Sequence, residues 1–144
     1  MNITASLLSR APGLLSAASE AEIKALETEL RVCFPNEYRD FLRLADGGQL
    51  TPGIILYSVG VGLHPAECLR TANDSKRSES PLVFVGRFAE EEFGFRKTDM
   101  VTTTKAGPLY LYAHEEDEIR ILSDTFTLFL LKSLEGNGTF IVEV

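Results

Sequence analysis

The sequence predicts one α+β domain with two N-terminal helices, an antiparallel meander sheet of about four to six strands, and a C-terminal helix packed on the sheet. Apolar residues recur at helical spacing up to Ala45, lie in extended segments from Gly53 onward, and return to helical spacing from Phe126. Strands that follow one another without long helices between them indicate α+β architecture instead of a parallel α/β sheet. We place the domain at residues 19–144 and treat residues 1–18 as an N-terminal extension.

The first helix is predicted to run from about Glu20 to Arg31. Ser19 and Glu22 form a capping box, in which each side chain satisfies a free backbone N–H at the start of the helix. Three apolar residues then recur at helical spacing, namely Ile23, Leu26 and Leu30. One face of this helix is therefore expected to be buried.

A second helix is expected to begin at Pro35, because the missing N–H of proline would be unpaired in the first helical turn anyway. Its apolar stripe consists of Tyr38, Phe41, Leu42 and Ala45. Gly47 and Gly48 follow, and glycine readily adopts the left-handed conformation of a C-terminal cap. We therefore expect this helix to end at the glycine pair.

Several later segments have the composition or the alternation of strands. They are Ile54–Val59, Leu82–Val85, Phe93–Arg96, Leu109–Ala113 and the alternating stretch around Ile119 and Ile121. The charged and polar residues His114–Asp117 predict a hairpin turn between the last two, because these side chains favour water.

The remaining segments complete the expected order. We predict a short helix at residues 64–69, an exposed loop at residues 71–80 and a terminal strand at residues 139–144. Ser123 or Asp124 is expected to cap the last helix, which should end at the glycines of residues 136–138.

The charge of the chain limits its partners. The formal net charge is −7, from 21 acidic and 14 basic residues. Binding nucleic acid through its phosphates needs a surplus of lysine and arginine, so nucleic acid is not an expected partner. No apolar run approaches the ~18 residues that span a membrane, and no signal peptide is recognisable. We therefore expect a cytoplasmic protein whose acidic surface attracts basic partners.

Residues that could carry chemistry are few. Cys33 and Cys68 have the spacing of neither a zinc site nor a disulfide framework. His64 and His114 could supply a base or a metal ligand, but both lie in predicted turns and no H-E-x-x-H or G-x-S-x-G pattern surrounds them. The glycines of residues 60–62 lack the third glycine of a dinucleotide motif. We predict no enzymatic activity, no metal and no cofactor.

Two acidic clusters are the candidate partner-binding residues. The first consists of Glu90, Glu91 and Glu92, and the second of Glu115, Glu116, Asp117 and Glu118. Both are expected in turns of the meander, so they could come together on one rim of the sheet. A negative rim would steer a basic partner and speed its association. Two solvated hairpin tips without a partner would have the same composition, and that reading stays open.

The pattern of the two helices also carries a family resemblance. Residues 22–30 (EIKALETEL), residues 34–42 (FPNEYRDFL) and Asp46-Gly47-Gly48 together resemble the opening signature of the SUKH superfamily. Residues 84–88, 107–112 and 123–130 continue the resemblance, which covers roughly Ser19 to Leu134. Asp46 stands where the family often has asparagine, and Glu90–Glu92 replace a turn richer in glycine and aspartate.

What the resemblance implies is a binding protein without catalytic residues. The superfamily includes bacterial immunity proteins that neutralise toxins, often nucleases, and fungal Smi/Knr-type regulators of cell-wall synthesis. We expect an immunity protein whose partner is a cognate basic toxin domain. A regulatory interaction module is the alternative, and a metal-assisted hydrolase using His64 or His114 is the third hypothesis.

Overall fold

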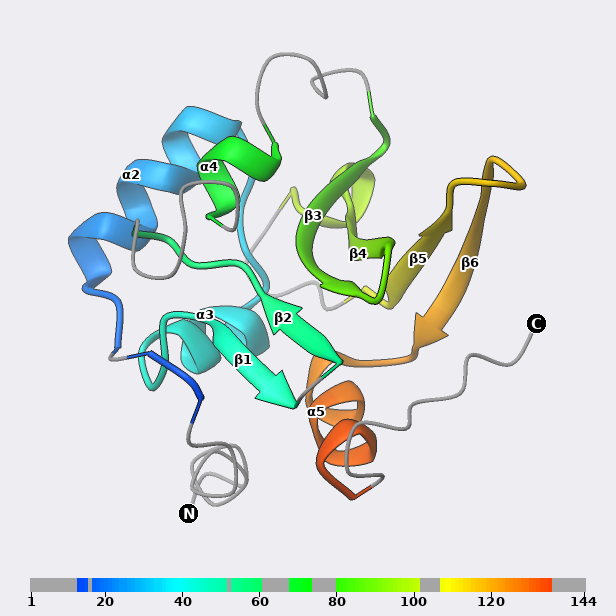
Figure 1. Cartoon of the computed structure of the whole chain (residues 1–144). Coiled ribbons are helices and arrows are strands. Elements are labelled where there is room, and N and C mark those ends of the chain that lie inside the picture. The colour runs from blue at the N-terminus through cyan, green and yellow to red at the C-terminus, as the bar shows by residue number, and fades with distance from the viewer. Residues whose placement is uncertain are drawn as a thin grey trace.

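The structure is a computed structural model that describes residues 13–15, 17–51, 53–60, 68–73, 80–101 and 107–135. Within these residues two helices come first, a sheet of consecutive strands follows, and a helix closes the fold (Figure 1). The predicted α+β class is therefore confirmed. The predicted strand at residues 139–144 lies outside the described residues.

The described residues form one six-stranded antiparallel sheet in which the strands lie in sequence order. The strands are β1 (Gly48–Thr51), β2 (Ile54–Leu56), β3 (Leu82–Phe88), β4 (Glu91–Arg96), β5 (Leu109–Ala113) and β6 (Glu118–Ser123). β5 has the predicted bounds, β3 and β4 are longer than predicted, and β1 was not predicted at all. In a simple meander of this kind, alternate hairpin turns lie next to each other at the same end of the sheet.

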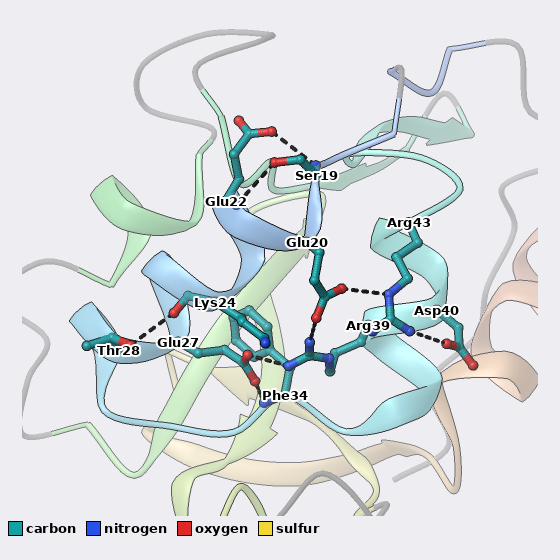
Figure 2. Close-up of polar contacts among 10 residues, drawn as sticks. All are labelled: Ser19, Glu20, Glu22, Lys24, Glu27, Thr28, Phe34, Arg39, Asp40 and Arg43. Atoms are coloured by element: carbon teal, nitrogen blue, oxygen red, sulfur yellow. Dashed lines mark hydrogen bonds and ion pairs between the residues drawn. The ribbon is translucent and has the colours of Figure 1, made fainter.

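The first predicted helix is α2 (Glu20–Leu30), and its capping box is present (Figure 2). The hydroxyl of Ser19 accepts a hydrogen bond from the backbone N–H of Glu22 at 3.1 Å, and the Glu22 carboxylate accepts one from the backbone N–H of Ser19 at 3.0 Å. Arg31 ends the helix in the left-handed conformation, with a φ of 60°. The buried apolar face consists of Ile23 and Leu26, as the periodicity predicts.

The second helix, α3 (Asn36–Leu42), ends earlier than predicted. Pro35 is its N-cap and Arg43 its C-cap, so the glycine pair does not end this helix. Gly47 and Gly48 have φ values of 73° and 116° for another reason. A Cβ on Gly47 would lie 2.6 Å from a backbone oxygen of β2, so the chain here needs glycine for its close approach to the sheet.

Two later helices also differ in detail from the prediction. The short helix α4 spans Leu69–Ala72, whereas most of the helix predicted at residues 64–69 lies outside the described residues. The last helix, α5, spans Phe126–Glu135. The hydroxyl of Thr125 accepts from the backbone N–H of Leu128 at 3.0 Å, so Thr125 caps α5, in place of Ser123 or Asp124.

Aromatic side chains join α3 and α5 to one face of the sheet. Phe93 of β4 packs on Phe129 of α5, with ring centroids 4.9 Å apart. Tyr38 of α3 lies 5.1 Å from the ring of Phe126 and 5.5 Å from that of Phe95. Burying each such ring contributes roughly 1.5–3 kcal/mol, so this layer stabilises the packing of both helices on the sheet.

A buried ion pair joins α2 to α3. Arg39 contacts the carboxylates of both Glu27 and Glu20, and Arg43 contacts Glu20 from the solvent side at 2.8 Å (Figure 2). Glu27 and Arg39 are only 9% and 7% exposed, so each requires the charge of the other. None of the helices in the described ranges has both the length and the apolar character needed to cross a bilayer.

Candidate protein-binding site

The strand register places two hairpin ends side by side at one end of the sheet. β4 begins at Glu91 directly after the turn from β3, and β5 ends at Ala113 directly before the turn into β6. Because β4 and β5 are antiparallel neighbours, the backbone N–H of His114 donates to the Glu91 carboxylate at 3.1 Å. The acidic clusters of the two turns are therefore adjacent.

We call the acidic residues of these two turns and their flanks the acidic hairpin end. It consists of Glu90, Glu91, Glu92, Glu115, Glu116, Asp117 and Glu118. The sequence-based placement of the first cluster in a turn is wrong for two residues, because Glu91 and Glu92 belong to β4. The reason is that only two residues, Ala89 and Glu90, connect the paired residues Phe88 and Glu91. Glu118 begins β6, in agreement with the alternation that predicts a strand there.

Cross-strand pairing puts polar and apolar side chains on one shared face of the sheet. Tyr112 of β5 lies opposite Glu92 of β4 on one side and opposite Ile119 of β6 on the other. The next row contains Phe84, Gly94, Tyr110 and Ile121. Directly opposite residues point to the same face, so this face is rich in large apolar side chains although it carries charges.

A hollow of about 700 Å³ opens on this face. Its apolar lining includes Leu82, Phe84, Tyr112 and Ile119, and its polar lining includes Glu90, Glu92, His114 and Asp117. The structure thus brings three of the predicted site residues into one hollow, namely Glu90 and Glu92 from the first cluster and Asp117 from the second. The remaining acidic residues of the hairpin end lie outside its lining.

Two tyrosine hydroxyls hold two of the three carboxylates of the hollow, those of Glu92 and Asp117, in place. The hydroxyl of Tyr112 donates to Asp117 at 2.7 Å, and that of Tyr57 donates to Glu92 at 2.7 Å. The hydrogen bond to Asp117, together with burial, raises the pKa of the Tyr112 phenol, so the hydroxyl stays a neutral donor. Both carboxylates are therefore oriented before any partner arrives.

Some basic side chains offset this negative charge. Arg87 lies directly opposite Glu92 in the β3–β4 pair, and Arg120 contacts Glu118 at 2.8 Å. Neither arginine lines the hollow, and no lysine or arginine is found in its lining among the described residues. The hollow itself therefore has a negative rim and an apolar wall.

His114 is the histidine that the described part of the chain contains. His114 is exposed, and its Nδ1 lies 3.2 Å from the Glu91 carboxylate. No group of three or more potential metal ligands occurs among the residues that the structure describes. His64 lies outside the described residues.

A second hollow, of about 570 Å³, lies beyond the opposite end of β4. Its lining includes Lys24, Arg31 and Lys97, together with the ion-paired residues Glu27 and Arg39. This hollow is more basic than the first. The two ends of β4 therefore present opposite charges.

The apolar wall of the first hollow was not singled out from the sequence. In the sequence, one residue separates Tyr110 from Tyr112, and one separates Ile119 from Ile121. This spacing puts each pair on one face of its strand. That alternation predicts a strand, but only the pairing shows that Tyr112 and Ile119 are neighbours. Phe84 joins them across β4, with its ring centroid 6.5 Å from that of Tyr112.

Comparison with known proteins gives one family. The sequence profile of the SMI1 / KNR4 family (SUKH-1) matches residues 17–132 of the chain. No curated protein matches the sequence. The matched region extends from the residues just before α2 into α5, and it includes both hairpins of the acidic end.

Proposed function

Because the chain belongs to the SMI1 / KNR4 family (SUKH-1), we propose that it is an immunity protein that binds and neutralises a cognate basic toxin domain. The family resemblance suggests binding without catalysis. Neutralisation by occlusion needs only a complementary interface of about 1,600 Å² with a few dominant contacts. No reacting group is required of such a protein.

The observation that carries this proposal is the acidic hairpin end with its hollow. Seven carboxylates from two hairpins gather at one end of the sheet of a chain with a net charge of −7. Such a surface complements a basic protein, and nuclease toxins need basic surfaces to hold their substrates. Carboxylates that cover such a surface would also compete with the nucleic acid.

Localised charge of this kind raises the rate of association as well as the affinity. Electrostatic steering brings oppositely charged partners together faster than diffusion of neutral surfaces, and it acts most strongly at low ionic strength. An immunity protein benefits from speed because the toxin must be bound before it reacts. The position of the charge at one end of the sheet gives the approach a direction.

The test is a pairing of this protein with the toxin-like domain encoded beside it. We expect the two proteins to co-purify, and we expect toxin activity to disappear at an equimolar amount of this protein. Heat-denatured protein is the control for nonspecific inhibition. A toxin that stays fully active with this protein in excess would contradict the proposal.

The family name also favours a second candidate, a regulatory interaction module of the Smi/Knr type. This alternative predicts a different set of partners. A pull-down that recovers cell-wall or signalling enzymes, with no toxin, would support the regulatory module. Recovery of a toxin domain alone would support immunity.

A further inference from the structure

The hollow at the acidic hairpin end combines two kinds of wall that seldom suit one ligand. Leu82, Phe84 and Ile119 offer apolar surface, whereas Glu90 and Asp117 offer carboxylate oxygens. A purely apolar side chain would leave the carboxylates without a counter-charge when water is displaced. A small cation would leave the apolar wall uncovered. A long side chain with an apolar stem and a cationic head matches both.

The aromatic part of the wall favours arginine over lysine. The rings of Phe84 and Tyr112 lie 6.5 Å apart across β4, at an interplanar angle of 48°. A guanidinium group is planar, stacks on aromatic rings and presents several N–H donors to carboxylates at once. An ammonium group is more strongly hydrated and offers no flat surface for stacking.

The same face already contains a contact of this kind. The guanidinium carbon of Arg96 lies 4.6 Å from the ring centroid of Tyr110. Tyr110 and Tyr112 are two residues apart in β5 and therefore point to the same side of the sheet. The neighbouring tyrosine thus shows that a strand-borne ring on this face accommodates a guanidinium group.

The carboxylate of Asp117 is held in position before any ligand binds. Asp117 accepts from the Tyr112 hydroxyl at 2.7 Å, which fixes the carboxylate beside the ring. Asp117 also has a φ of 51°, which the hairpin turn imposes. Side chains that are ordered before binding lose less conformational entropy when a ligand arrives.

We propose that the hollow receives an arginine side chain of the protein partner, with the guanidinium group on the Tyr112 ring and hydrogen-bonded to the carboxylate of Asp117. This inference rests on the proposed protein-binding function. It names the contact that anchors the partner. An arginine buried at the centre of an interface is among the side chains that contribute most to binding.

The test uses the full chain, labelled with ¹⁵N, and the blocked peptide acetyl-Gly-Arg-Gly-amide. Binding should shift the amide resonances of Glu92, Tyr112 and Ile119. The same peptide with citrulline has nearly the same shape without the charge, and it should bind at least about tenfold more weakly, since hydrogen bonds between charged groups are the stronger ones. The lysine peptide should fall between the two.

Variants separate the hollow from the general charge of the molecule. Asp117→Asn should weaken arginine-peptide binding at least about threefold, since asparagine tolerates a positive φ but lacks the charge. Asp124→Asn removes one charge from an exposed residue outside the hollow and should leave the affinity unchanged. Tyr112→Leu keeps an apolar side chain without the ring, and well-dispersed amide resonances would establish that it folds.

Several results would overturn the proposal. They are equal binding of the citrulline and arginine peptides, equal binding of the lysine and arginine peptides, shifts confined to other surfaces, and equal effects of Asp117→Asn and Asp124→Asn. The peptide test is independent of the toxin. Peptide binding without any toxin inhibition would contradict the immunity function alone, whereas toxin inhibition without peptide binding would contradict the arginine site alone.

Discussion

Glu27 of α2 and Arg39 of α3 neutralise one another in the interior, and the same Glu27 carboxylate accepts a hydrogen bond from the backbone N–H of Phe34 at 2.6 Å. Phe34 lies in the segment between the two helices and is completely buried. One carboxylate therefore fixes both the angle between the helices and the path of the chain that joins them. This arrangement explains why an acidic residue lies on the buried side of an otherwise apolar helix face.

Replacing Glu27 by alanine should destabilise the protein strongly. Arg39 would keep its buried position but lose its main counter-charge, and removing one partner of a buried pair costs about 3–5 kcal/mol. Glu29→Ala is the matched control, because Glu29 lies on the same helix and forms an exposed pair with Arg70. The free energy of unfolding of this control should fall by only about 0–1 kcal/mol. Urea unfolding measures both, and equal losses would contradict the structural role of Glu27.

The hydroxyl of Tyr38, unlike the carboxylate of Glu27, should not contribute to stability. This side chain is 1% exposed, and its hydroxyl has no hydrogen-bond partner among the described residues. Tyr38→Phe removes the buried hydroxyl and keeps the ring contacts, so stability should be unchanged or increase by up to about 1 kcal/mol. Tyr38→Ala also removes the ring and should cost about 3–5 kcal/mol.

Thermal unfolding of the two Tyr38 variants separates these contributions. A loss of more than about 1 kcal/mol for Tyr38→Phe would mean that the hydroxyl has a hydrogen-bond partner after all. Burial raises the pKa of this phenol, so it remains protonated across the accessible pH range. The comparison is therefore free of any contribution from ionisation.

Local signals are enough to predict the start of α2 and most strands. The capping box of Ser19 and Glu22 is complete within four residues, so the sequence locates the start of α2 without knowledge of the fold. The alternation in Leu109–Ala113 is likewise complete within the segment itself, and it predicts the observed bounds of β5. The adjacency of the two acidic clusters also followed correctly from the order of a meander.

Features that depend on distant segments were not predictable. The preference of glycine for helix caps predicts a cap at Gly47, but this residue instead allows the close approach to β2. The turn after β3 contains Ala89 at a φ of 55°, and alanine gives no signal that locates the turn. The acidic composition alone therefore predicts a turn that also includes Glu91 and Glu92, which belong to β4. The apolar wall of the hollow depends on the register of Phe84, β4 and Tyr112, which no local pattern contains.

Asp46 should make stability depend on pH in mildly acidic solution. Burial raises the pKa of its carboxyl, the charge of Glu22 adds to this, and hydrogen bonds from the backbone N–H groups of Val59 and Gly60 oppose it. A carboxyl whose pKa is raised by folding binds its proton more tightly in the folded state. Its stabilising contribution is therefore full below the unfolded pKa and is lost as the pH rises through the folded pKa.

Asp46→Asn removes this titration. We expect the stability of the wild type, relative to the variant, to fall as the pH rises from 3.8, the ordinary pKa of aspartate, towards neutrality. Urea unfolding at a series of pH values gives the difference directly. A difference between the two proteins that stays constant over this range would contradict the burial of a charged Asp46.

The acidic hairpin end should control the rate at which the proposed toxin partner binds. Glu90, Glu115 and Glu116 are exposed and have no described side-chain partner, so lysine at these positions should leave the fold intact. The triple variant should reduce the association rate constant by about tenfold or more at low salt, because it replaces attraction by repulsion along the approach. Stopped-flow mixing with the toxin domain measures this rate.

The matched control is the lysine triple variant of Glu29, Asp40 and Asp124, which changes the net charge equally at exposed residues on other elements. Its association rate should fall much less, because steering depends on charge near the binding surface. Raising the ionic strength should make the association rate constants of the two variants similar, since the Debye length falls to about 3 Å at 1 M salt. If both variants slow association equally at every salt concentration, net charge alone governs binding and the acidic hairpin end is not the docking surface.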